Sequence, residues 1–389
     1  MSRLGAFFQS LDQTDCPGSY PPGVHCIVLA MTYRAVLRGY LLEEALAWLL
    51  RNTGYRLLVD AQQDPDELVM EGNTLLVQGR GTTHQVDVLG EFALTPAFSL
   101  PIRMFIEAKF HRERCNLTVV RNAHGVIHDV NENFVHTGSS RPRRRYQYVY
   151  ALFSASGFTE QAQAYALAQQ ISLVDMSGMS FEWLRQKIAA AAADLYALRN
   201  HHGVARFPVS WMRQELRVRL GTPLPEAFAG GEEGWTPEVT TNAPRFRTAA
   251  AGIIESLAAE LLATERSELL LGFPAAPFIL VLGADDPDLF VRYAEEHPTH
   301  AVRLRRAGFG GHAEWSVSSW EDPGAYRLAF NLPEQIESWI SENEERRFRR
   351  INSIKSDFLS EIAIYRRNGD DMWIYQLRYE TAELHRPAQ

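Results

Sequence analysis

A chain of 389 residues is long for one compact domain and predicts two. Its 46% hydrophobic and 22% charged residues exclude a disordered protein, and no apolar run reaches the roughly 18 residues that would span a membrane. The net charge of -8 argues against a protein that coats nucleic acid by charge alone. Three cysteines without a C-x-x-C spacing predict no disulfides, and with no recognisable leader sequence we expect a cytoplasmic protein.

The first half of the chain predicts alternating helices and strands. Residues 1–37 are expected to form an irregular lead-in, and leucines at helical spacing predict a helix at 38–52 that ends at Asn52-Thr53-Gly54. The segments that follow are expected to be strands at 55–59, 68–78, 84–94 and 101–110, a helix at 123–133, a strand at 146–153, a helix at 160–170 and a strand at 171–174. This order predicts an α/β domain over 38–200, with a mixed central sheet flanked by helices.

The second half predicts a separate α+β domain. A helix is expected at 181–198, and the Gly- and Pro-rich composition of 201–244 indicates a linker region. Residues 245–389 are then expected to form a C-terminal recognition, regulatory or assembly domain. Its expected elements are helices at 249–263 and 335–352, strands at 278–282, 301–305, 314–318 and 326–330, and a hairpin at 362–379 turning at Asn368-Gly369.

Charged residues on an apolar strand stand out in the run Phe105-Ile106-Glu107-Ala108-Lys109. Strand alternation places Glu107 and Lys109 on one face, an awkward arrangement for a core and a natural one for a site. Asp87 lies on the strand expected next to this one, which would bring two carboxylates together.

Two carboxylates suit a hard cation such as Mg²⁺, which prefers oxygen ligands and keeps water and substrate phosphate in its shell. We expect Asp87 and Glu107 to be the ligands, with the Ala108 carbonyl as a third. Lys109 would position the attacking water and favour its deprotonated form. The reaction indicated is hydrolysis of a phosphodiester, with Mn²⁺ as a substitute metal.

Asp87 followed by Glu107-Ala108-Lys109 resembles the signature of the PD-(D/E)XK nucleases, with Val86 where the family name has proline. Two flanking segments resemble the Mrr-like branch of the restriction endonucleases. The first is the helix that carries Glu43, and the second is the β-α-β pattern of residues 153–175. The resemblance covers about 38–178 and implies a restriction-endonuclease-like core in which Glu43 reaches the metal site.

Several of these residues have competing interpretations. Glu43 adjoins Glu44 and is equally consistent with a surface glutamate. Gln85 shares the face of Asp87 and could orient water or a phosphate, but a packing or surface role is favoured. The run from Arg141 to Arg145 comprises four arginines around one proline, and residues 103–121 hold five Lys or Arg against two acids. Arg141, Arg143, Arg144 and Arg145 are therefore candidate phosphate contacts, with a solvated loop as the alternative.

The sequence thus predicts a metal-dependent DNA endonuclease, acting in restriction or anti-phage defence. Two alternatives stay open: a non-catalytic nucleic-acid-binding or scaffold protein with a nuclease-like fold, and a nuclease directed at RNA. A homo-oligomer, and a small-molecule or protein regulator that binds the C-terminal domain, also stay open.

Overall fold

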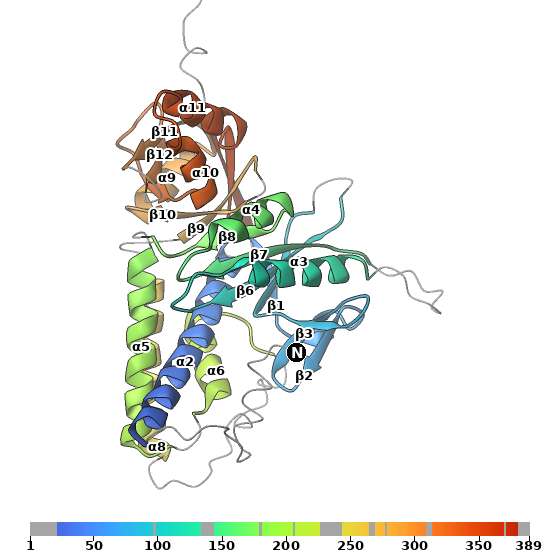
Figure 1. Cartoon of the computed structure of the whole chain (residues 1–389), viewed down its shortest axis with the longest axis vertical. Helices are drawn as coiled ribbons and strands as arrows, with labels where there is room; N and C mark the ends of the chain where they lie inside the picture. The colour runs from blue at the N-terminus through green and yellow to red at the C-terminus, as the bar shows by residue number, and fades with distance from the viewer. Residues whose placement is uncertain are drawn as a thin grey trace, which may run out of the picture.

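The structure is a computed structural model, shown in Figure 1. It describes residues 22–95, 99–133, 144–178, 181–204, 207–225, 243–263, 269–276, 278–308, 313–368 and 371–379. The side chains of the first helix are described from residue 33 onward.

The first half of the chain contains the elements of a mixed α/β layer structure. In chain order they are α2 (Pro22–Asn52), β1 (Tyr55–Leu58), η1 (Ala61–Gln63), β2 (Leu68–Glu71), β3 (Thr74–Gln78), β4 (Thr83–Gln85), β5 (Val88–Phe92), β6 (Ile102–Lys109), α3 (Leu117–Asn131), β7 (Gln147–Ser154), α4 (Glu160–Ala168) and β8 (Ser172–Asp175). The expected alternation of helices and strands is confirmed, but the segment expected as one strand at 68–78 forms two paired strands, β2 and β3. Helix α2 extends into the stretch expected to be an irregular lead-in.

The central sheet has five strands in the order β1-β5-β6-β7-β8. Strands β1, β5 and β6 pair antiparallel, and β6, β7 and β8 pair parallel, so the sheet is mixed as expected. Side chains alternate across it: Met104 and Ile106 pack with α2 on one face, and Phe105 packs beneath α3 and α4 on the other. The sheet is therefore covered by helices on both faces (Figure 1).

The single strand expected at 84–94 is divided in two. Strand β4 joins β2 and β3 in a separate three-stranded sheet, and β5 begins the antiparallel part of the central sheet. The division falls at Val86 and Asp87. Val86 donates its backbone N–H to the Leu75 carbonyl at 3.3 Å and is buried, so the chain leaves one sheet at Val86 and enters the other at Val88.

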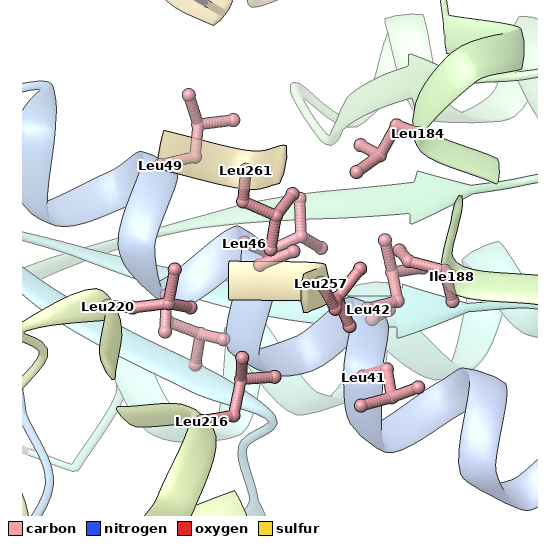
Figure 2. Packing of buried hydrophobic residues seen from close by; sticks show 14 of the residues in the cluster. Leu41, Leu42, Leu46, Leu49, Leu184, Ile188, Leu216, Leu220, Leu257 and Leu261 are labelled. Carbon is pink, nitrogen blue, oxygen red and sulfur yellow. The ribbon is translucent and has the colours of Figure 1, made fainter. Parts of the chain in front are cut away.

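Three further helices share a core with α2. Helices α5 (Glu182–His201) and α6 (Val209–Leu220) contact α2, and α8 (Ala243–Leu262) packs on α5 and α6. Figure 2 shows leucine and isoleucine side chains from all four helices converging on one another. The labelled members are Leu41, Leu42, Leu46, Leu49, Leu184, Ile188, Leu216, Leu220, Leu257 and Leu261, all buried. Burying one such side chain contributes about 1.5–3 kcal/mol, so this cluster binds the four helices to the sheet.

This packing corrects two expected boundaries. The linker expected at 201–244 contains helix α6, whose Trp211, Met212 and Leu216 are buried among the other helices. Helix α8 falls within the expected C-terminal domain, yet its Phe246 and Ile254 belong to the core that covers the central sheet. The physical reason is that each helix buries an apolar stripe against its neighbours: α6 packs on α2 and α8, and α8 packs on α5 and α6.

The C-terminal part is a closed seven-stranded barrel, in the order β10-β13-β12-β11-β15-β14-β9. Its core contains Trp315, Phe330 and Tyr375, all almost completely buried. The elements are β9 (Leu269–Pro274), β10 (Leu280–Ala284), α9 (Pro287–Glu296), β11 (Thr299–Ala307), β12 (Glu314–Ser319), β13 (Leu328–Phe330), α10 (Glu334–Ser341), α11 (Arg347–Asp357), β14 (Glu361–Asn368) and β15 (Asp371–Tyr379).

The expected strands and hairpin of this part are confirmed, and Asn368 pairs with Asp371 across the hairpin turn. The one helix expected at 335–352 is instead two helices, α10 and α11. Strand β9 and helix α9 were not expected. Barrel closure depends on β9, because it pairs with both β10 and β14.

Candidate active site

Asp87 and strand β6 meet where β5 begins. The Asp87 Oδ2 atom accepts a hydrogen bond from the Ala108 backbone N–H at 2.9 Å. Val88 pairs with Ile106 in the antiparallel ladder, so Asp87 lies just before the first residue of β5 and beside the last residues of β6. The structure therefore brings Asp87 against the Glu107-Ala108-Lys109 segment.

Glu107 and Lys109 share one face of β6, as alternation predicts, and they form an ion pair. The Lys109 Nζ contacts Glu107 Oε1, while the hydroxyl of Tyr150 on β7 donates a hydrogen bond to Oε2. Tyr150 is buried, and Glu107 and Lys109 are half-buried. Both carboxylate oxygens of Glu107 thus have a defined partner.

The charges at this site influence one another. Burial raises the pKa of Asp87, the positive charge of Lys109 offsets part of the rise, and the negative charge of Glu107 adds to it. For Lys109 burial favours the neutral amine, but Glu107 and Asp87 outweigh it and hold its pKa above the ordinary lysine value. Lys109 is therefore charged at neutral pH, which suits electrostatic stabilisation rather than action as a general base.

Glu43 lies near this centre and belongs to a second ionic group. The Arg213 side chain of α6 pairs with Glu43 at 2.9 Å and with Glu44 at 2.6 Å, and Arg217 pairs with Glu44 at 2.6 Å. Glu44 is completely buried, whereas Glu43 keeps 13% of its side chain exposed. Of the two glutamates, Glu43 is the one that interacts electrostatically with Asp87. The ion pairs of Glu44 join α2 to α6.

Burial raises the pKa of Glu43 to about 8, although Arg213 lowers it; the negative charges of Asp87 and Glu44 contribute to the rise. Two arginines keep the pKa of Glu44 below its ordinary value despite complete burial. The two adjacent glutamates therefore differ: Glu44 ionises below the ordinary glutamate pKa, whereas Glu43 keeps its proton to a higher pH.

A cavity of about 230 Å³ adjoins the site. It lies between α2, the three-stranded sheet and α6, and its lining includes Glu43, Gln85, Asp87 and Arg213. Gln85, at the end of β4, is exposed and lines this cavity rather than contacting Glu107 or Lys109. Carboxylate, amide and guanidinium groups thus line one cavity beside Asp87.

The two basic stretches expected from the sequence, 141–145 and 103–121, differ in how their arginines are exposed. Arg141 and Arg143 lie outside the described residues. Arg144 is exposed, 3.8 Å from a Glu91 oxygen and 5.2 Å from the centre of the Tyr146 ring, and Arg145 is also exposed. Within 103–121, Arg103 is buried and hydrogen-bonded to Glu91 at 2.9 Å, so this arginine stabilises the fold and is not part of a basic surface.

Asp87, Glu107 and the Ala108 carbonyl are oxygen donors of the kind that Mg²⁺ prefers. Across the described ranges, no group of three or more His, Cys, Asp and Glu side chains is close enough to hold a metal by itself. Mg²⁺ needs only one or two carboxylates when water and substrate phosphate complete its shell. Asp87 and Glu107 are such carboxylates, and the Ala108 carbonyl points to the same strand edge as its N–H, which bonds Asp87.

Sequence reasoning missed Arg213 and Tyr150. Arg213 lies in the segment expected to be a linker, and the helical spacing of Trp211, Met212 and Leu216 was the signal that could have revealed its helix. Tyr150 lies in an expected strand, but its partner depends on which strand is the neighbour of β6. Parallel pairing of β6 with β7 decides that.

Comparison with known proteins found one weak structural similarity. No protein family model and no curated protein matches the chain. One solved structure, entitled "Crystal Structure of Protein of Unknown Function AF1548", aligns with 57% of this chain and 98% of its own, with 18% sequence identity and a TM-score of 0.29. A TM-score of that size does not establish a shared fold. None of the described helices is long and apolar enough to cross a membrane.

Proposed function

We propose that the chain is a metal-dependent endonuclease that hydrolyses phosphodiester bonds in DNA, with a restriction-endonuclease-like core around β5 and β6. The observation that carries the proposal is the hydrogen bond from the Ala108 N–H to Asp87. It joins Asp87 to the Glu107-x-Lys109 pair, whose residues lie 20 and 22 positions further on in the sequence. A role in restriction or anti-phage defence, within the cytoplasm, belongs to the same proposal.

The chain's own groups support distinct roles. Asp87, Glu107 and the Ala108 carbonyl would hold Mg²⁺ or Mn²⁺, which when bound supplies Lewis-acid stabilisation of the phosphate charge. Tyr150 keeps the Glu107 carboxylate in one orientation. Lys109, positively charged beside Glu107, would hold the attacking water and stabilise the negative charge that develops on phosphorus-bound oxygen. In the overall reaction water adds to phosphorus, one P–O ester bond breaks, and the leaving oxygen takes a proton.

Glu43 is assigned a positioning role rather than that of a metal ligand. Its carboxyl is held by Arg213 and lines the cavity beside Asp87. Gln85 lines the same cavity and is suited to orient water or a phosphate oxygen there. The C-terminal barrel is proposed to serve recognition or regulation, and its core is filled by side chains such as Trp315.

Incubation with plasmid DNA, modified phage DNA and RNA, each with Mg²⁺ or with excess EDTA, tests the function. We expect DNA nicking or cleavage that EDTA abolishes. Cleavage of RNA alone would establish the RNA-directed alternative. Binding of DNA without cleavage of any substrate would favour the non-catalytic alternative, and undiminished cleavage in EDTA would contradict the metal-dependent mechanism.

A further inference from the structure

Three arginines gather where helix α2 passes the end of strand β6. Arg34 and Arg38 are four residues apart on α2, so their side chains share one face of the helix. Arg112 follows the last residue of β6 by three positions. The Arg38 guanidinium lies 5.9 Å from the centre of the Phe110 ring, which places it beside the end of the strand. We call Arg34, Arg38 and Arg112 the arginine cluster.

No described carboxylate forms an ion pair with a member of the arginine cluster. Arg34 instead packs against Tyr196, 5.0 Å from the ring centre. The buried Nε of Arg38 makes no hydrogen bond with any described group. Burial lowers the pKa of Arg38, and the charges of Arg112 and Arg34 lower it further. Two positive charges therefore repel that of Arg38, and the buried Arg38 Nε has no acceptor among the described groups.

Two other buried or half-buried arginines near the sheet have carboxylate partners. Arg103 is paired with Glu91 and Asp64, and Arg213 is paired with Glu43 and Glu44. Those arginines stabilise the fold through carboxylates of the same chain. Among the described residues the arginine cluster has no such carboxylate partner, and an anion from outside the chain that binds the guanidinium groups would offset the repulsion.

The location of the arginine cluster indicates which anion. Arg112 lies three residues after Lys109, so the extended chain keeps it within about 11 Å of the proposed catalytic lysine. Phosphate oxygens accept paired hydrogen bonds from the planar guanidinium group, and a nucleic-acid backbone presents them at regular intervals. A strand whose reacting phosphate lies at Lys109 would carry a neighbouring phosphate to the arginine cluster.

We propose that Arg34, Arg38 and Arg112 form a phosphate-binding subsite that holds the backbone of duplex DNA beside the Asp87, Glu107 and Lys109 centre. This inference rests on the proposed function. It adds a binding surface that is separate from the run at Arg141 to Arg145 and that combines Arg112, from the basic stretch 103–121, with two arginines of α2. Contacts to phosphate position a substrate without reading its bases, so the arginine cluster contributes affinity rather than sequence preference.

The decisive experiment is a salt titration of duplex DNA binding in EDTA, where affinity is measured without cleavage. The test variant is Arg34→Gln/Arg38→Gln/Arg112→Gln. The matched control is Lys187→Gln/Arg245→Gln/Arg247→Gln, which removes the same charge from exposed positions of helices α5 and α8. We expect the test variant to bind at least ten-fold more weakly at low salt. Its slope of log affinity against log salt should fall by about 0.9 for each lost phosphate contact, while the control keeps the wild-type slope.

A second measurement uses thermal unfolding with inorganic pyrophosphate as the probe. The wild-type protein and the control should be stabilised by pyrophosphate, and the test variant should not, because its anion site is removed. If the triple variant fails to fold, the exposed residues are tested singly as Arg34→Gln and Arg112→Gln. Equal DNA affinity, salt slope and pyrophosphate response in the test and control variants would overturn the inference.

Cleavage is scored separately, so that the two proposals fail independently. If the wild-type protein cuts no nucleic acid with Mg²⁺, the nuclease proposal fails, and the salt titration still decides whether the arginine cluster binds DNA. If the protein cuts DNA and the test variant binds and cuts as the control does, only the arginine-cluster inference fails. Loss of binding confined to RNA would overturn the assignment of duplex DNA.

Discussion

The Tyr150 hydroxyl donates a hydrogen bond to the Glu107 carboxylate from the neighbouring parallel strand. Burial and the Glu107 charge raise the pKa of Tyr150 well above its ordinary value, so the hydroxyl stays protonated and remains a donor. Lys109 contacts the other carboxylate oxygen. Glu107 is thus held between two side chains that lie on different strands.

Tyr150→Phe should therefore reduce cleavage without removing a charged group. Loss of a hydrogen bond that orients a metal ligand typically costs about 10–100-fold in metal affinity or activity. We expect a higher Mg²⁺ requirement in a titration of the cleavage rate. Tyr165→Phe is the control, because it removes a hydroxyl that bonds His124 at 2.9 Å and not Glu107. An unchanged Mg²⁺ dependence for Tyr150→Phe would show that the hydroxyl does not position the site.

The variant Lys109→Ala tests whether the protein is an enzyme or a non-catalytic scaffold. The variant should fold and bind DNA, while its cleavage rate falls by about 10²–10³-fold or more through lost stabilisation of the transition state. Single-turnover cleavage and a binding assay in EDTA measure the two effects. Lys187→Ala is the control, since Lys187 pairs with Glu260 between α5 and α8. Wild-type cleavage by Lys109→Ala would make the catalytic assignment wrong.

Asp87→Ala should also abolish cleavage, with weakened metal binding in addition. The side chain supplies a proposed metal ligand and accepts the Ala108 N–H bond. Calorimetric titration with Mn²⁺ measures the metal affinity, and Asp285→Ala, on the distant barrel, is a control for general loss of negative charge. Wild-type Mn²⁺ affinity in Asp87→Ala would remove Asp87 from the ligand set.

Glu44→Gln should destabilise the fold strongly. Its two oxygens receive Arg213 and Arg217 inside the protein, and breaking a buried ion pair typically costs about 3–5 kcal/mol because the remaining charges lose their partner. Urea denaturation measures the loss. Glu260→Gln breaks a more exposed pair and should cost about 0–1 kcal/mol. Equal stability of the two variants would contradict this account of how α6 is attached to α2.

Glu43→Gln should change how stability depends on pH. Because burial raises the folded-state pKa of Glu43 from 4.5 to about 8, the stability it contributes is fully present below the unfolded pKa and is lost as pH rises through about 8. Gln cannot ionise, so in EDTA the unfolding temperature of the variant relative to wild type should increase between about pH 5 and about pH 9. A difference that stays constant across this range would contradict the raised pKa.

The sequence by itself determined the local elements and the candidate chemistry. Some patterns span only a few residues and therefore predict local structure directly. Examples are the leucine spacing of α2, the apolar run of β6 and the Asn368-Gly369 turn signal. Strand alternation was sufficient to place Glu107 and Lys109 on one face, which their ion pair confirms. The catalytic role of these residues stays a prediction, because spacing indicates chemistry but does not demonstrate it.

Only the tertiary structure decided which distant groups meet. Arg213 reaches Glu43 across 170 positions of sequence because α6 packs its apolar side against the α2 helix, a contact that local preference does not encode. Parallel pairing selects Tyr150 as the partner of Glu107, and the passage of α2 beside β6 brings Arg34 and Arg38 to Arg112. Burial of apolar surface drives these packings without directional preference, so the pairing of elements depends on the whole chain.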